Sequence, residues 1–165
     1  PLFHIVGITP EAPNLAAVKG INLPVTKITD DNLATLRSDF GAKGERPDVI
    51  VFAAPQLSIV EMGKVSSLVN GQKLKVPMIV CTSPQTYGDA RRMGFVDKIE
   101  NAGGVVLEGT CFYQQGAKEI GEANGWVRLL SNSTKIVNIL GGYGYKPALA
   151  SMEDCVGAAI NGKIA

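Results

Sequence analysis

The sequence predicts a three-layer α/β fold, in which a largely parallel β-sheet has helices on both faces. Short apolar runs bounded by turn residues recur along the chain, and segments with helix-start patterns lie between them. Most of these runs are continuously apolar rather than alternating, which is typical of parallel strands buried on both faces. The 165 residues, with 45% hydrophobic content, have the size and apolarity of one globular domain. We therefore expect a single α/β domain over residues 1–165.

The predicted strands are the apolar runs themselves. They are Leu2–Ile8, Val25–Ile28, Val49–Ala54, Met78–Thr82, Val105–Glu108 and Val127–Leu130. Because ligands gather at the carboxyl ends of parallel strands, the loops that follow the later strands are the candidate binding segments. These loops comprise residues 53–58, 81–83, 109–112 and 131–135.

Capping patterns mark where the helices begin. The starts are Thr29-Asp30-Asp31, Ser58 with Glu61, Ser83-Pro84 and Ser151. The first of these helices is expected to run to about Phe40, and the helix after Ser83 to carry Tyr87, Met93 and Val96. Residues 112–125 are polar with weak periodicity and form either a loop or a short helix. Residues 141–144 (Gly-Gly-Tyr-Gly) follow a helical segment, which favours a helix terminator over a dinucleotide-binding loop.

The charge balance argues against two classes of partner. Sixteen basic and fifteen acidic residues give a net charge of +1, which leaves no field to gather a nucleic-acid backbone or an anionic membrane surface. The longest apolar runs are far shorter than the roughly 20 residues that cross a bilayer, and no signal-peptide pattern opens the chain. We expect a soluble, cytoplasmic protein without nucleic-acid or membrane partners. Because the first residue is Pro1, the chain is either processed or a piece of a longer one.

The cysteines disfavour a disulfide scaffold and a self-contained zinc site. Cys81, Cys111 and Cys155 are widely spaced, and His4 is the one histidine in the sequence. Cys81 ends an apolar run and is expected in the core. Cys111 follows a predicted strand, so its thiol is either a soft-metal ligand or a buried structural group, and the same alternatives hold for Cys155. His4 lies within an apolar run, where a hydrogen-bonded strand histidine is the commoner role.

The segment from Ser131 to Lys135 joins a predicted strand to a helix start. Its hydroxyls, its amide and its lysine would suit an anionic substrate group such as a carboxylate or a phosphate. The alternative is an ordinary helix N-cap, although a cation in the first turn opposes the helix dipole.

Four stretches of the sequence, taken together, resemble the C-terminal half of the large part of aconitase X proteins. They are Pro1 to Ala12, which contains the pattern His-x-x-Gly-x-Thr-Pro-Glu-Ala, then Pro55-Gln56-Leu57-Ser58, Gly109-Thr110-Cys111, and Ser131-Asn132-Ser133-Thr134-Lys135 followed by Glu153-Asp154-Cys155-Val156. The similarity runs along nearly the whole chain, and the opening pattern is its most specific part.

The resemblance implies an aconitase-like α/β domain of a hydro-lyase that uses an iron–sulfur cluster of two-iron or four-iron type. The implied reaction is a dehydration: a base removes the proton alpha to the substrate carboxylate, and an open iron site acts as Lewis acid on the departing hydroxyl. By this resemblance Cys111 and Cys155 are metal ligands. The implied substrate-binding residues are Asn132, Ser133, Lys135, Ser58, His4, Thr9 and Glu11.

Three departures from the family pattern bear on substrate choice and activity. The commonest form of the family has histidine in place of Gln56, aspartate in place of Gly109 and arginine in place of Pro84. Each change removes a titratable or charged group, and no residue of the chain is identified as the catalytic base.

The resemblance also implies partners: a small carboxylate substrate, an N-terminal half of the large part that carries another cysteine, and a swivelling domain or small subunit. The chain alone is then expected to be inactive and to expose an apolar face where those parts pack. The expected substrate is cis-3-hydroxy-L-proline, with mevalonate 5-phosphate as the alternative. Two other hypotheses are a non-catalytic domain that keeps the fold and binds a carboxylate or phosphate, and an unrelated doubly wound domain with inert cysteines.

Overall fold

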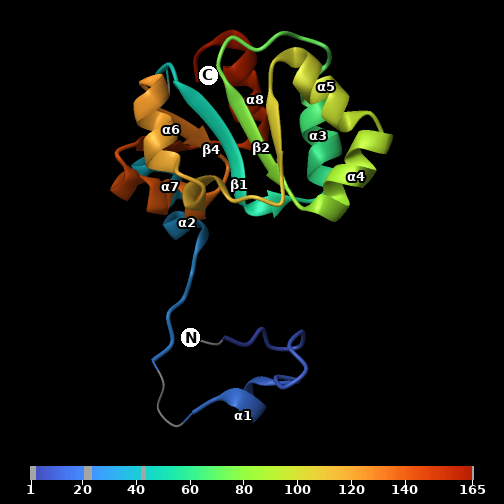
Figure 1. Cartoon of the computed structure of the whole chain (residues 1–165). Helices are drawn as coiled ribbons and strands as arrows, with labels where there is room; N and C mark the ends of the chain where they lie inside the picture. The colour runs from blue at the N-terminus through green and yellow to red at the C-terminus, as the bar shows by residue number, and fades with distance from the viewer. Residues whose placement is uncertain (1–2, 21–23, 42–43, 165) are drawn as a thin grey trace. The chain divides into compact units, whose positions relative to one another are not determined.

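The computed structural model describes residues 3–20, 24–41 and 44–164. These residues divide into two compact units, Pro1–Leu33 and Ala34–Ala165, and each unit is described by itself (Figure 1). The sheet lies entirely in the second unit. The expectation of one α/β domain over the whole chain stays a prediction.

The second unit is built on a five-stranded parallel sheet, which confirms the predicted α/β class. Its strands are β1 (Val49–Leu57), β2 (Met78–Thr82), β3 (Val105–Glu108), β4 (Arg128–Ser131) and β5 (Lys146–Leu149). They lie in the order β3-β2-β1-β4-β5, with all neighbouring pairs parallel. The first strand, β1, is therefore the central one: β2 and β3 lie on one side of it, and β4 and β5 lie on the other.

Helices cover both faces of this sheet and complete the three layers (Figure 1). One face carries α3 (Ile59–Val69), α4 (Pro84–Arg92), α5 (Phe95–Ala102) and α8 (Met152–Asn161). The other face carries η1 (Phe112–Gln114), α6 (Ala117–Asn124), α7 (Thr134–Leu140) and η2 (Gly141–Tyr143). Within the ranges that the structure describes, no helix combines the length and apolarity needed to cross a bilayer.

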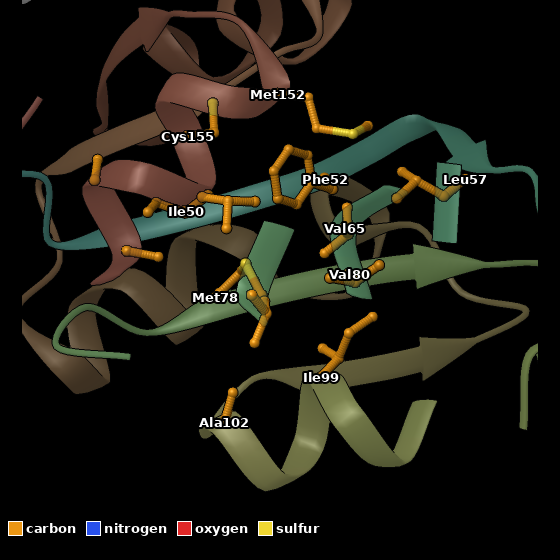
Figure 2. Close-up of a cluster of buried hydrophobic side chains, with 14 of the residues drawn as sticks. Ile50, Phe52, Leu57, Val65, Met78, Val80, Ile99, Ala102, Met152 and Cys155 are labelled. Carbon is orange, nitrogen blue, oxygen red and sulfur yellow. The ribbon is translucent and has the colours of Figure 1, made fainter. Parts of the chain in front are cut away.

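The side chains of β1 alternate between two hydrophobic clusters, one on each face of the sheet. Ile50 and Phe52 belong to the first cluster, which lies between the sheet and the helices α3, α5 and α8. Figure 2 shows this cluster closing around β1 and β2. Val49 and Val51 belong to the second cluster, between the sheet and η1, α6 and α7. Continuous apolarity in the sequence thus reflects burial on both sides of the strand.

Serine side chains begin four helices at the carboxyl ends of the strands. The N-caps are Ser58 of α3, Ser83 of α4, Ser133 of α7 and Ser151 of α8. Each hydroxyl accepts a hydrogen bond from a backbone N–H of the first turn, which satisfies a donor that has no partner within the helix. The predicted capping box of Ser58 with Glu61 is confirmed.

Several boundaries differ from the sequence prediction. The helix expected after Ser83 is divided into α4 and α5 by Gly94, whose φ of +75° lies in the left-handed region. Of the two alternatives left open for residues 112–125, the short helix is confirmed, since the segment contains η1 and α6. Strand β5 was not predicted, because Lys146–Leu149 is short and contains Pro147. Such a strand is tolerated at the sheet edge, where β5 pairs with β4 alone.

The first unit contains no strand in its described residues, so the two strands predicted there are wrong. Residues 3–5 have no regular secondary structure and lead into a turn at residues 6–8, and residues 25–28 also have no regular secondary structure; Leu2 lies outside the described residues. Backbone hydrogen bonds from Gly7 to Ala12 and from Thr9 to Ile5 close the turn. The helices here are α1 (Leu15–Val18) and α2 (Asp30–Asp39), which spans the division between the units.

Two glycines in helix interiors give a test of the packing on the second cluster. A methyl group on Gly121 of α6 would lie 2.7 Å from the Tyr145 hydroxyl, which is buried and donates a hydrogen bond to the Ala117 carbonyl at 2.7 Å. We expect Gly121→Ala to lower the free energy of unfolding by about 1–3 kcal/mol, because the buried ring must shift. Gly157→Ala is the matched control, since open space surrounds Gly157 of α8. It should raise stability by about 0.5–1 kcal/mol. Chemical denaturation measures both, and equal effects would contradict the packing.

Candidate functional site at the carboxyl edge of the sheet

The candidate site lies where the strand order reverses. From β1 the chain passes to β2 and β3 on one side, and later returns to β4 and β5 on the other side. In open α/β sheets the loops after the two strands at such a switch point diverge and leave room for a ligand at the carboxyl edge. Here those loops follow β1 and β4, so residues from both are expected to face the same space.

Strand β1 is irregular at this edge. Its pairing with β2 is regular through Phe52, and the register then shifts before Leu57 pairs with Thr82. Residues 53–56 therefore form an excursion beyond the regular ladder. Gln56 belongs to this excursion, and its Nε2 donates a hydrogen bond to the carbonyl oxygen of Thr110 at 3.0 Å.

The segment after β3 crosses the ends of β2 and β1. Gly109, with a φ of +64°, begins the crossing, and its N–H donates to the Thr82 carbonyl at the end of β2 at 2.8 Å. Thr110 then meets Gln56 at the end of β1. Phe112 is fully buried in the second cluster and anchors the far side of the crossing. The segment from β3 to α6 can be followed along the edge of the sheet in Figure 1.

Thr110 and Cys111, at the middle of this crossing, each carry a polar group that makes no bond within the described residues. The Thr110 hydroxyl oxygen is buried and has no hydrogen-bond partner among the described residues. Buried hydroxyls are almost always paired, so an unpaired one indicates a missing water or ligand. Cys111 is half-buried and its thiol is free, next to this hydroxyl in the chain.

Hydrogen bonds from two serine hydroxyls join the end of β4 and the segment after it to β1. Ser131 donates to the Val51 carbonyl and Ser133 to the Ala54 carbonyl, each at 2.7 Å. Ser133 also accepts a hydrogen bond from the N–H of Ile136 as the N-cap of α7. Its only O–H donor is therefore used in holding the loop, and Ser133 has the N-cap role. Its part in substrate binding stays a prediction.

Asn132 and Lys135 remain available on this loop. Asn132 is half-buried and Lys135 is exposed. The Lys135 Nζ lies 5.7 Å from the centre of the Tyr113 ring, a distance at which an ammonium is attracted to the ring face. Because Tyr113 follows Cys111 by two residues, this contact brings the β3 crossing and the β4 loop to one place.

Ser58 and Cys155 have structural surroundings. The Ser58 hydroxyl donates to the Glu61 carboxylate at 2.6 Å and caps α3. Cys155 is fully buried in the first cluster, where Figure 2 shows it on α8 near Ile50. Burial raises the pKa of its thiol well above the usual value, and the charges of Asp154 and Glu153 raise it further. Cys111 packs against the second cluster, so the two cysteines lie against opposite faces of the sheet.

Three predicted site residues belong to the first unit. His4 and Glu11 are exposed, and the Thr9 hydroxyl accepts a hydrogen bond from the Ile5 N–H at 2.9 Å within the turn. Their part in substrate binding stays a prediction.

The second unit thus brings together Thr110, Cys111 and Gln56 with the loop that carries Asn132 and Lys135. Within residues 3–20, 24–41 and 44–164, no group of three or more His, Cys, Asp or Glu side chains could hold a metal ion alone. Sequence reasoning placed Thr110 and Gln56 in candidate loops without giving either a role in the site, noted Gln56 as a departure from the family pattern, and missed Tyr113. The position of these loops after predicted strands was a signal that could be used. The partners of the residues could not be predicted, because they depend on how the segment from β3 to α6 crosses the sheet.

Comparisons with known proteins agree with this description. A family model described as the aconitase X third domain matches residues 47–161. A cis-3-hydroxy-L-proline dehydratase from Pseudomonas aeruginosa is 26% identical over 99% of this chain and 29% of its own length. A phosphomevalonate dehydratase large subunit from Methanothermobacter thermautotrophicus is 31% identical over 73% of this chain and 30% of its own length. The chain therefore spans about three tenths of the length of these relatives.

A solved structure shares the fold. The holo-form of Thermococcus kodakaraensis aconitase X matches with a TM-score of 0.73 and 21% sequence identity, over 93% of this chain and 38% of that one.

The burial of the three thiols predicts a graded reactivity. Burial raises the pKa of Cys81 to about 11, and Cys155, which is also fully buried, has its pKa raised by burial too. Because the thiolate is the reactive form, both should resist alkylation in the native chain at about pH 8. We expect iodoacetamide to modify Cys111 first, and the other two only after denaturation. Peptide mass spectrometry reads each site, and native-state modification of Cys155 at the rate of Cys111 would contradict the placement.

Proposed function

The chain belongs to the aconitase X family, in which it matches the third domain, and from this membership we propose that it is one domain of a hydro-lyase that removes water from a small hydroxy acid. The observation that carries the proposal is the contact of Lys135 with the Tyr113 ring, which brings the loop after β4 to the segment that carries Thr110 and Cys111 at the switch point. A free thiol, an ammonium and a buried hydroxyl that lacks a partner among the described residues then belong to the segments at one edge of the sheet.

We propose that Cys111 is the ligand that the second unit supplies to an iron–sulfur cluster. Cys111 has a half-buried free thiol, which fits one ligand position, and the Thr110 hydroxyl that precedes it in the chain is buried without a hydrogen-bond partner among the described residues. One thiolate does not hold a cluster, and the described residues contain no group that would complete it. The remaining ligands therefore come from other parts of the enzyme. When bound, such a cluster supplies a Lewis acid for the hydroxyl that leaves the substrate.

We assign substrate binding to Lys135 and Asn132. The Lys135 ammonium lies beside the Tyr113 ring, which limits its motion without neutralising its charge, and it would bind the substrate carboxylate. The Asn132 amide, half-buried on the same loop, would donate a further hydrogen bond. Ser58 and Ser133 would support this site by capping α3 and α7. The catalytic base is expected outside this chain.

We propose cis-3-hydroxy-L-proline as the substrate. The cis-3-hydroxy-L-proline dehydratases align with nearly the whole chain, whereas the phosphomevalonate dehydratase of Methanothermobacter aligns with a smaller part. In the described loops at the switch point, Lys135 is the cation that faces the site, and a phosphate group would need more positive charge than one ammonium. An assay of both substrates on the complete enzyme decides between them.

We propose that the rest of the enzyme packs near this edge, as the expected N-terminal half and swivelling domain or small subunit. An apolar hollow of about 270 Å³ lies beside the start of α3 and is lined by Ile59, Val60, Gly63, Met93 and Phe95. Val60 is 77% exposed and Met93 57% exposed, which is unusual for a contiguous apolar surface that stays in water. A cytoplasmic location stays a prediction.

The cluster is tested on the complete enzyme. We expect the assembly of this chain with its remaining parts, prepared anaerobically, to contain iron and acid-labile sulfide and to absorb visible light. Cys111→Ser should lose these signals because it removes a ligand. Cys155→Ala is the control and should keep them, since Cys155 lies in the core. A colourless, iron-free native assembly would contradict the proposal and leave a non-catalytic binding domain as the better account.

The role of Lys135 is tested by steady-state kinetics on the same assembly. Lys135→Met removes the charge that would bind the carboxylate, so KM should rise by at least about ten-fold. Because Lys135 is exposed, the stability of the chain should not change. Lys98→Met, at an exposed position of α5, is the matched control. A KM equal in the two variants would remove Lys135 from the site.

A further inference from the structure

Gln56 makes the side-chain hydrogen bond that links the end of β1 to the segment of Cys111. The bond joins its Nε2 to the Thr110 carbonyl at 3.0 Å and is partly buried, although the two residues are 54 positions apart. The excursion of β1 beyond its regular pairing with β2 is what carries Gln56 to this place.

Other bonds hold the neighbours of Thr110 but not its carbonyl. The Gly109 N–H is bonded to Thr82, and the Cys111 carbonyl accepts the N–H groups of Gln114 and Gln115. Between these two anchors, the Thr110 carbonyl is the backbone group that Gln56 holds. Because the peptide unit is planar, fixing this oxygen fixes the plane that leads to the Cys111 backbone nitrogen. Because the Cys111 carbonyl is held as well, the peptide planes on both sides of the Cys111 Cα are fixed, and these two planes together set the direction of its Cα–Cβ bond.

We propose that Gln56 is a positioning residue that holds the Cys111 thiol in its orientation at the carboxyl edge. The role of the thiol as a ligand rests on the proposed function. The way in which the thiol is held rests on the geometry alone. To make this bond, the side chain at position 56 needs an N–H donor at the distance from the backbone that the glutamine amide reaches. Methionine matches the side-chain length without a donor, glutamate replaces the donor with an acceptor that repels the Thr110 carbonyl, and a histidine ring offers an N–H at a similar reach.

The test measures the alkylation rate of Cys111 by iodoacetamide, on the native 165-residue chain and its variants, with peptide mass spectrometry. Gln56→Met and Gln56→Glu release the Thr110 carbonyl, and the rate at Cys111 should rise by about five-fold, the factor that one hydrogen bond is worth. Gln56→His should restore the native rate. Gln85→Met, at an exposed position of α4, is the matched control and should leave the rate unchanged.

The buried thiols report whether each variant is folded. Cys81 and Cys155 should stay unmodified in every variant, because general unfolding would expose all three thiols rather than Cys111 alone. Native rates in Gln56→Met and Gln56→Glu overturn the proposal. Where a donor-free variant exposes Cys81, Gln56→His decides: a native rate supports the proposal, and a raised rate overturns it. The measurement needs no cluster, so an iron-free assembly would refute the proposed function while this result stands.

Discussion

The crossing of the chain from β3 to α6 is the constraint on which the candidate site depends. β3 lies at one edge of the sheet, so a connection that continues to β4 must pass the ends of β2 and β1. It does so at the carboxyl edge, held by the Gly109 bond to Thr82 at its start and by buried Phe112 at its end. A short segment stretched between two fixed points has few conformations, and Thr110 and Cys111 are the residues between those points. The parallel sheet thus creates the site by forcing a loop to run across it.

The hydroxyl groups at this edge are of two kinds: those that hold the fold by hydrogen bonds, and one that is left to bind a ligand. The hydroxyls of Ser58, Ser83 and Ser133 each cap a helix, and those of Ser131 and Ser133 donate hydrogen bonds to carbonyls of β1. Satisfied hydroxyls contribute to stability and offer a ligand little, because a ligand would have to break an existing bond. The buried Thr110 hydroxyl differs from them, because it has no hydrogen-bond partner within the described part of the chain. Pairing it through a water or a ligand removes the cost of burying a donor without a partner, so occupancy of this edge is favourable for the protein as well as for the ligand.

The sequence was informative where burial and local chemistry coincide, and uninformative where distant segments meet. Strands β1 to β4 were predicted because continuous apolarity reports burial on both faces, and the helix starts because a serine cap is a local interaction. The same apolarity misled in the first unit, where Phe3 is 80% exposed and Ile8 76% exposed. Apolar composition there indicates neither burial nor pairing. In the site, the place of Cys111 after β3 was predictable. Its link to Gln56 was not, because that bond depends on the register shift in β1 and on the crossing.

The arrangement of the cysteines bears on how a cluster and the fold of the enzyme depend on each other. Cys155 packs between α8 and the sheet, on the face opposite to Cys111, so moving its thiol to the carboxyl edge would open the first cluster. A cluster at Cys111 then needs ligands from beyond the described residues. Binding free energy from a ligand set shared between domains is also free energy of domain association, because the cluster binds the assembled form and not the separate parts. Loss of the cluster should therefore loosen the assembly. In the proposed assembly, the apolar hollow beside the same edge would give the domains a second contact, one that does not depend on the cluster and would help to bring the remaining ligands to Cys111.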